Sequence, residues 1–77
     1  MVKMFLIKID KNIAYYHCVP ENNENKSFDI GIDVEKQEMV YNSLGKKDNY
    51  VSHAEWRIYD VYEETQCIPE MEISIWV

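Results

Sequence analysis

Apolar and polar residues alternate along five stretches of this chain, with the period of two that is typical of half-buried β-strands. The third stretch is the most regular, because Phe28, Ile30 and Ile32 alternate with Asp29 and Gly31. A compact polar segment before residue 13 and a proline after residue 19 are typical of strand boundaries. The sequence therefore predicts strands over residues 3–9, 13–19, 28–34, 38–43 and 71–77.

Between residues 50 and 65 this alternation gives way to helical spacing. Apolar side chains recur there three and four positions apart, which predicts one helix with a single apolar stripe. Two residues compete as its N-cap. Ser52 with Glu55 has the form of a capping box, which would put Val51 and Trp56 at the two hydrophobic-staple positions. The alternative cap, Asp48, would lengthen the helix by about one turn.

The resulting β-β-β-β-α-β order predicts a single small α+β domain over residues 1–77. Short connections favour an antiparallel meander of the first four strands. The helix then returns the chain along the sheet, so that the last strand lies beside the first. We expect a five-stranded antiparallel sheet in the order 5-1-2-3-4, with the helix packed across one face.

A single helix covers one face of such a sheet, so the other face should be polar where it meets water. The third strand fits this rule, with Asp29, Gly31 and Asp33 on that face, but the first, second and fifth strands do not. We expect the helix to cover the side that carries Phe5. The prediction is therefore an interaction surface on the uncovered face, formed by Met4, Leu6, Tyr15 and Trp76.

Two points about this surface stay open at the level of sequence. In the other register of the second strand, Tyr16 replaces Tyr15 on the uncovered face. In the reversed register of the last strand, Trp76 belongs to the core, and Ile73 and Ile75 lie outside.

The outer face of the predicted helix is a second candidate surface. It carries His53, Trp56, Asp60, Glu63 and Glu64. Trp56 is also explained as a staple residue, and the two glutamates oppose the helix dipole at the end of the helix.

The segment HCVPE at residues 17–21 recurs as QCIPE at residues 66–70, and the two copies hold both cysteines and both prolines. The strand order separates Cys18 and Cys67 by roughly 20 Å, whereas a disulfide needs Cα atoms within roughly 7 Å. Adjacent His17 and Cys18 point to opposite faces of a strand, so the zinc alternative is weak. We expect free thiols and no metal or other cofactor. No catalytic motif is present, and we do not expect an enzyme.

Charge and the N-terminal segment restrict the partners. Eight Lys and Arg against fourteen Asp and Glu give a net charge of −6, which disfavours direct nucleic-acid binding. The apolar run of residues 4–7 is too short for a signal peptide or a membrane span. We therefore expect no membrane association and a cytoplasmic location.

Four segments, YYHCVPE, IGIDVEKQEMV, YVSHAEWRIYDVYEE and IPEMEISIW, together resemble a group of short bacterial proteins of uncharacterised function. That family has Pro-Glu after an early strand, a glycine-containing hairpin, a His-Ala helix, and a second Pro-Glu before an aromatic-ended strand. Gln37 stands where its hairpin has a glycine. The resemblance implies the same order of strands and helix and brings no known activity.

Two classes of function fit these features. The one we favour is a non-catalytic interaction module, either a homodimer or a subunit that binds another protein through its apolar sheet face. The alternative is an acidic inhibitor whose carboxylates mimic phosphates and occupy a basic nucleic-acid-binding protein. That alternative predicts a continuous band of carboxylates, whereas here they are scattered over loops, the third strand and the helix.

Overall fold

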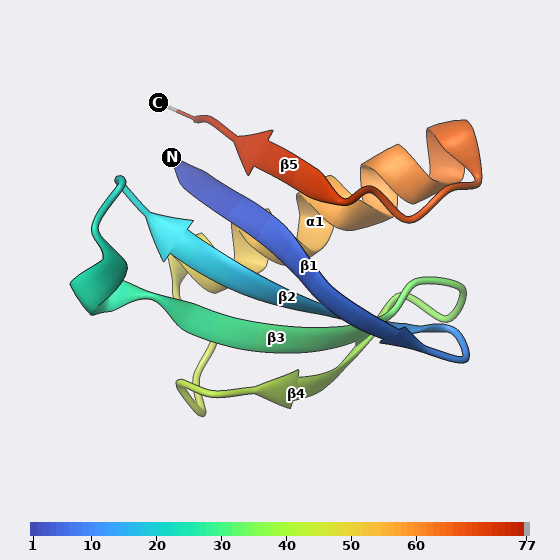
Figure 1. Cartoon of the computed structure of the whole chain (residues 1–77), viewed down its shortest axis with the longest axis horizontal. Helices are drawn as coiled ribbons and strands as arrows, with labels where there is room; N and C mark the ends of the chain where they lie inside the picture. The colour runs from blue at the N-terminus through green and yellow to red at the C-terminus, as the bar shows by residue number, and fades with distance from the viewer. Residues whose placement is uncertain (77) are drawn as a thin grey trace.

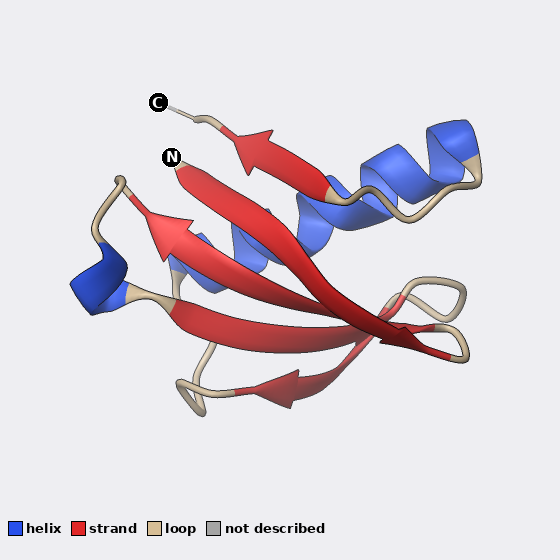
Figure 2. Ribbon diagram, in the orientation of Figure 1, coloured by secondary structure: helices blue, strands red, loops and turns tan. Residues whose placement is uncertain are grey.

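The computed structural model describes residues 1–76, which form one antiparallel sheet crossed by one long helix (Figures 1 and 2). Its elements are β1 (Val2–Asp10), β2 (Ile13–Pro20), the short 3-10 helix η1 (Glu24–Lys26), β3 (Phe28–Asp33), β4 (Glu38–Asn42), α1 (Asn49–Thr65) and β5 (Met71–Ser74). The sheet order is β4-β3-β2-β1-β5, with every neighbouring pair antiparallel. The predicted α+β fold and strand order are therefore confirmed.

Cross-strand register decides which side chains face α1. Directly opposite residues on adjacent strands share a face of the sheet. On β3 the buried set includes Phe28, which lies opposite Cys18 of β2, and Cys18 in turn lies opposite Met4 of β1. The register therefore puts Cys18 of β2 and Met4 of β1 on the same buried face as Phe28 of β3. Met4 and Cys18 are fully buried in the same core cluster as Ile58 of the helix.

The predicted faces of β1 and β5 are therefore wrong. Met4 lies in the core, Leu6 and Trp76 pack against it, and Phe5 is exposed on the opposite face. A bulge between Leu6 and Lys8 also interrupts the alternation of β1, so its apolar residues do not form one continuous face. The reversed arrangement of the last strand, with Trp76 against the core, is the one observed.

The predicted helical stripe is confirmed where α1 meets the sheet. Val51, Ala54 and Ile58 are fully buried. Of the two candidate caps, Asp48 is the one used, because its carboxylate accepts a hydrogen bond from the backbone N–H of Val51 at 2.9 Å. With α1 starting at residue 49, Trp56 no longer occupies a staple position, and its side chain is exposed.

The two Pro-Glu segments have different surroundings in the structure. Cys18 is buried and Cys67 is exposed, and both thiols are free, as predicted. The second segment is held by a different contact: the hydroxyl of the fully buried Tyr16 donates a hydrogen bond to the carbonyl of Pro69 at 2.6 Å. This bond ties the connection between α1 and β5 to the centre of the sheet. Burial also raises the pKa of Tyr16, so the hydroxyl stays a donor.

The N-cap leads to a first prediction. We expect Asp48→Ala to lower the free energy of unfolding by about 1 kcal/mol, because it leaves an N–H of the first turn without its acceptor. Ser52→Ala is the matched control and should change it by less than about 0.5 kcal/mol. Urea unfolding followed by circular dichroism measures both, and a larger loss for Ser52→Ala would contradict the assigned cap.

Gly31 leads to a second prediction. A Cβ atom at this position would lie 2.6 Å from Cε1 of Tyr15, whose ring covers the glycine, and 3.2 Å from Cβ of Tyr41. We expect Gly31→Ala to destabilise the protein by about 1–3 kcal/mol through overpacking. In a Tyr15→Ala background, urea unfolding should show a smaller cost of the same change. Equal costs in the two backgrounds would contradict the contact.

Candidate interaction surface

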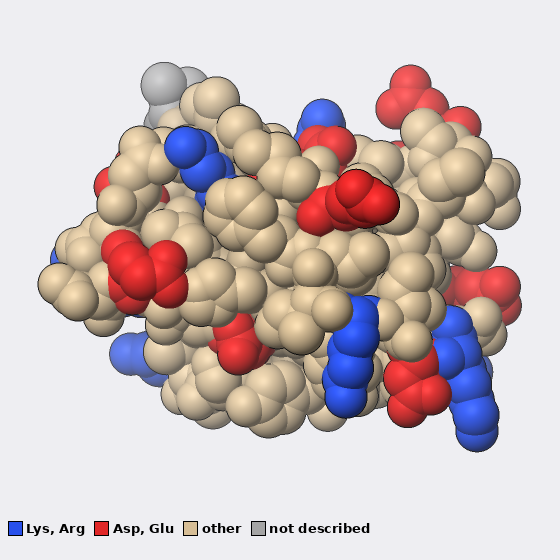
Figure 3. All heavy atoms as spheres, viewed as in Figure 1, with Lys and Arg blue, Asp and Glu red and all other residues tan. Residues whose placement is uncertain are grey.

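Exposed apolar side chains gather on the sheet face opposite α1, over β1 and β5. Phe5 and Met71 are cross-strand partners, and Ile73 lies one alternation further along β5, opposite Lys3. Ile75 directly follows the end of β5 at Ser74, two positions beyond Ile73. Their exposed fractions are 40% for Phe5, 44% for Met71, 36% for Ile73 and 77% for Ile75. We call these four residues the apolar patch. Figure 3 views this side of the molecule and shows a broad uncharged area with charged side chains scattered around it.

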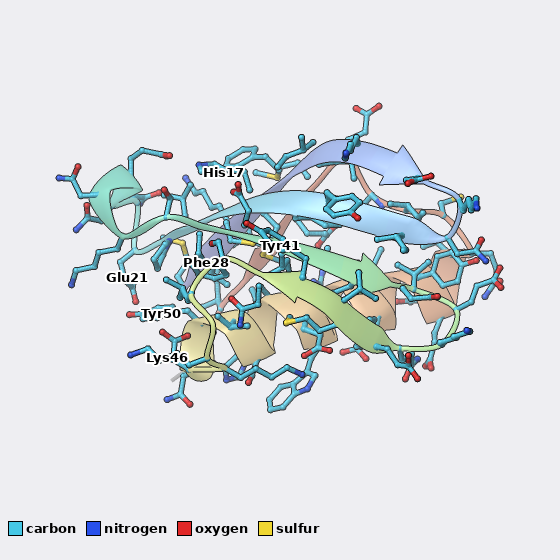
Figure 4. All side chains as sticks on the ribbon, turned by 90° about the horizontal axis from the view of Figure 1, so that it is seen from below. His17, Glu21, Phe28, Tyr41, Lys46 and Tyr50 are labelled. Carbon is cyan, nitrogen blue, oxygen red and sulfur yellow. The ribbon has the colours of Figure 1, made fainter. Side chains whose placement is uncertain are left out.

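The same face is polar over β3, and β2 contributes His17 to it. His17 lies opposite Phe5 on one side and Asp29 on the other. Its Nδ1 is 2.7 Å from Oδ1 of Asp29, and its Nε2 is 2.5 Å from Oε1 of Glu24 in η1. Both ring nitrogens therefore face carboxylate acceptors, an arrangement satisfied by the doubly protonated imidazolium. Figure 4 shows His17 on the side of the sheet away from α1.

These contacts raise the pKa of His17 above its ordinary value. The hydrogen bond to Asp29 is the largest cause and the bond to Glu24 the second, while partial burial acts in the opposite direction. His17 thus joins Glu24 of η1 to Asp29 of the sheet. It also marks the border between the apolar patch and the acidic half of this face.

Of the four residues predicted to form the surface, the structure leaves Tyr15 on the open face. Its ring lies against Gly31, and Nζ of Lys8 is 4.9 Å from the ring centroid. Met4 is in the core, with Leu6 and Trp76 packed against it. The apolar patch was missed because its residues belong to the more regular apolar alternation, which the sequence assigned to the core.

The second predicted surface is aromatic at one end and acidic at the other. The ring of His53 stacks on Trp76 at a centroid distance of 3.9 Å and meets the edge of Trp56 at 5.3 Å. Trp76 also meets the edge of Tyr50 at 5.5 Å. Trp76 thus joins this helical cluster and not the open face. The remaining predicted members, Asp60, Glu63 and Glu64, are exposed toward the end of α1.

A buried carboxylate on α1 was also missed by the sequence reasoning. Glu55 is 4% exposed, accepts a hydrogen bond from the hydroxyl of Tyr59 at 2.6 Å, and pairs with Nζ of Lys47 at 2.9 Å. Burial, followed by the bond to Glu55, raises the pKa of Tyr59. The spacing of four between Glu55 and Tyr59, next to the apolar stripe, is the signal that would have indicated this pair. Because both carboxylate oxygens are engaged, the arrangement stabilises the β4–α1 connection.

Two hollows border that connection. The larger, of about 610 Å³, lies between β4 and the start of α1, with Lys46, Lys47 and Glu55 among its lining residues. The smaller, of about 370 Å³, has Phe28, Lys46 and Tyr50 in its wall, and these three lie at one end of the molecule in Figure 4. Their charges are mixed, and the one buried carboxylate is already paired, so neither hollow presents a defined chemical site.

Within residues 1–76, no group of three or more His, Cys, Asp or Glu side chains is placed to hold a metal ion. In the same part of the chain, no helix has the length and apolar character needed to cross a membrane.

The His17 cluster leads to a third prediction. Because folding raises this pKa, the folded state holds the proton more tightly than the unfolded chain. The stabilisation should be complete below the unfolded value of about 6.5 and should be lost as the pH rises through the higher folded value. We therefore expect the free energy of unfolding of the wild type to decline over that window in urea titrations.

Matched variants test this assignment. In His17→Gln the decline over this window should disappear, and Asp29→Asn should reduce it more than Glu24→Gln does, because Asp29 is the larger cause of the shift. An unchanged decline in His17→Gln would show that His17 is not its source.

No family model matches this chain, and no curated protein or solved structure matches it either. The resemblance of its motifs to short bacterial proteins therefore stays a prediction, and the functional argument rests on the surface described above.

Proposed function

We propose that this protein is a non-catalytic protein-interaction module whose contact surface is the apolar patch. One observation carries the proposal: two adjacent strands expose four large apolar side chains side by side on the face that α1 leaves uncovered. Contiguous exposed apolar patches of this kind mark interaction sites on soluble proteins. Its burial is favourable by about 25 cal/mol for each Å² removed from water.

The setting of the patch suits a protein partner. Lys3 and Lys8, on the same strand as Phe5, lie on the same face of the sheet as the patch. Asp29 and Asp33 lie on that face too, two strands away on β3. An apolar centre with charges of both signs around it is the usual anatomy of a protein–protein interface. The acidic half, with His17 inserted between carboxylates, disfavours a phosphate-bearing ligand. Two free cysteines, one of them exposed, are in keeping with a module that works in the reducing cytoplasm.

A matched pair of double variants provides the fourth prediction. Met71→Lys with Ile75→Lys puts two charges into the patch, while Val40→Lys with Leu44→Lys puts the same two charges at comparably exposed apolar positions around β4. We expect the wild type and the β4 pair to form the same complex, with another protein or with themselves. The patch pair should weaken that complex by about tenfold or more.

Analytical ultracentrifugation measures self-association, and affinity capture followed by titration of the purified complex measures a heterologous one. Circular dichroism confirms that both variants fold. A patch pair that binds as tightly as the wild type would overturn the proposal. So would a wild type that forms no complex of either kind at concentrations up to about 1 mM.

A further inference from the structure

The two edges of the sheet are unequal. The edge strand β4 contains a bulge at Val40, between the pairs that Met39 and Tyr41 make with β3, and bulges protect an edge against further pairing. The edge strand β5 pairs with β1 in unbroken register. Met71–Ser74 contains neither proline nor lysine, and within residues 1–76 no strand pairs with its outer side. Figure 1 shows β5 at the margin of the sheet.

The alternation of hydrogen-bonded pairs along the β1–β5 ladder identifies which backbone N–H and C=O groups of β5 point away from β1. The backbone N–H of Leu6 donates to the carbonyl of Glu70 at 2.8 Å, which makes this a hydrogen-bonded pair of the β1–β5 ladder. Hydrogen-bonded and non-hydrogen-bonded pairs alternate in an antiparallel ladder. Met71 and Ile73 are therefore non-hydrogen-bonded toward β1, and their N–H and C=O groups point outward. Ile75 directly follows the last residue of β5, Ser74, and continuing the same alternation by two residues would turn its backbone groups outward as well. The residues with free backbone groups are thus the β5 members of the apolar patch.

We infer that β5 pairs antiparallel with β5 of a second copy, with Ile73 opposite Ile73 across a two-fold axis. This inference deepens the proposed function and rests on it, since it names the partner of the apolar patch. Met71 of each copy then lies opposite Ile75 of the other. The pairing joins two five-stranded sheets into one continuous sheet of ten strands.

The register follows from the sequence of the strand. Outward-pointing residues must face one another, which leaves three symmetric registers, centred on residue 72, 73 or 74. Centring on Glu72 sets two like charges directly opposite each other at the closest cross-strand spacing, which is destabilising. Centring on Ser74 pairs only Ile73 with Ile75. The register centred on Ile73 engages all three outward residues and puts Glu72 opposite Ser74.

Self-pairing also explains the side chains on both faces of β5. On the open face, the rows of Met71, Ile73 and Ile75 from the two copies become neighbours, so the two apolar patches merge. On the helix face, Glu72 already pairs with Arg57 at 2.9 Å and brings no unpaired charge to the junction. Each copy uses its one regular edge, and the bulged β4 edges remain outside, so association ends at the dimer.

The first test removes one backbone donor, and it provides the fifth prediction. Ile73→Pro deletes an N–H that points away from β1, so the intramolecular ladder is kept, as for prolines on natural edge strands. Ile73→Ser is the control, because it shortens the side chain and keeps the N–H. Sedimentation equilibrium should show a dimer for the wild type, a weaker dimer for Ile73→Ser and a monomer for Ile73→Pro. A monomeric wild type, or a dimeric Ile73→Pro, would overturn the inference.

A second test reads the register directly and does not depend on how well the proline variant folds. In a Cys67→Ser background, Ile73→Cys puts two cysteines opposite each other at a Cα separation of about 5.5 Å, within reach of a disulfide. Under mild oxidation this variant should form a covalent dimer. Ile75→Cys and Val40→Cys should remain uncrosslinked, whereas a mixture of Met71→Cys and Ile75→Cys chains should crosslink to each other. Equal crosslinking at positions 40, 73 and 75 would overturn the register.

The two proposals fail separately. If the wild type stays monomeric but binds another protein, and the Met71→Lys, Ile75→Lys variant does not bind it, the interaction module is supported and the self-pairing is overturned. A wild type that dimerises through β5 supports both.

Discussion

The ladder between β2 and β3 is the constraint on which the rest of the structure depends. Because β3 has one face that is fully apolar, with Phe28, Ile30 and Ile32, its orientation toward α1 is fixed by the hydrophobic effect alone. Pairing transmits this choice, strand by strand, to Cys18 and then to Met4. A shift of one residue in either ladder would turn every side chain of β1 to the other face. Either face of β1 could be buried on composition alone, since both of its faces carry apolar residues.

The same constraint creates the apolar patch. Once Met4 is committed to the core, Phe5 must point away from α1, and its partner Met71 on β5 must point the same way. The one long helix, α1, packs on the opposite face of the sheet and does not reach the face that carries Phe5. The chain therefore carries more apolar surface than its own fold removes from water. Surplus of this kind, next to a sheet edge whose free backbone groups belong to Ile73, is the basis of the dimer that we propose.

Polar contacts hold the connections that lie outside this ladder. Tyr16 reaches from the core to the carbonyl of Pro69, and Glu55 pairs with Lys47. His17 joins Glu24 of η1 to Asp29 of β3. Each of these groups is buried or partly buried and is fully partnered, and no buried side-chain N or O atom among the described residues lacks a hydrogen bond. The polar residues thus stabilise the loops. The open face is where large apolar side chains remain exposed to water.

The order of elements, the antiparallel sheet, the helical stripe through Ala54 and Ile58, and the separation of the two cysteines were determined by the sequence alone. These features depend on local periodicity and on short connections, and both can be read from neighbouring residues. Which face of β1 is buried, and therefore whether Met4 or Phe5 is exposed, was decided only by tertiary structure. The reason is physical: register and the bulge before Lys8 arise from pairing between distant segments, and a strand that is apolar on both sides carries no local record of which side the helix will cover.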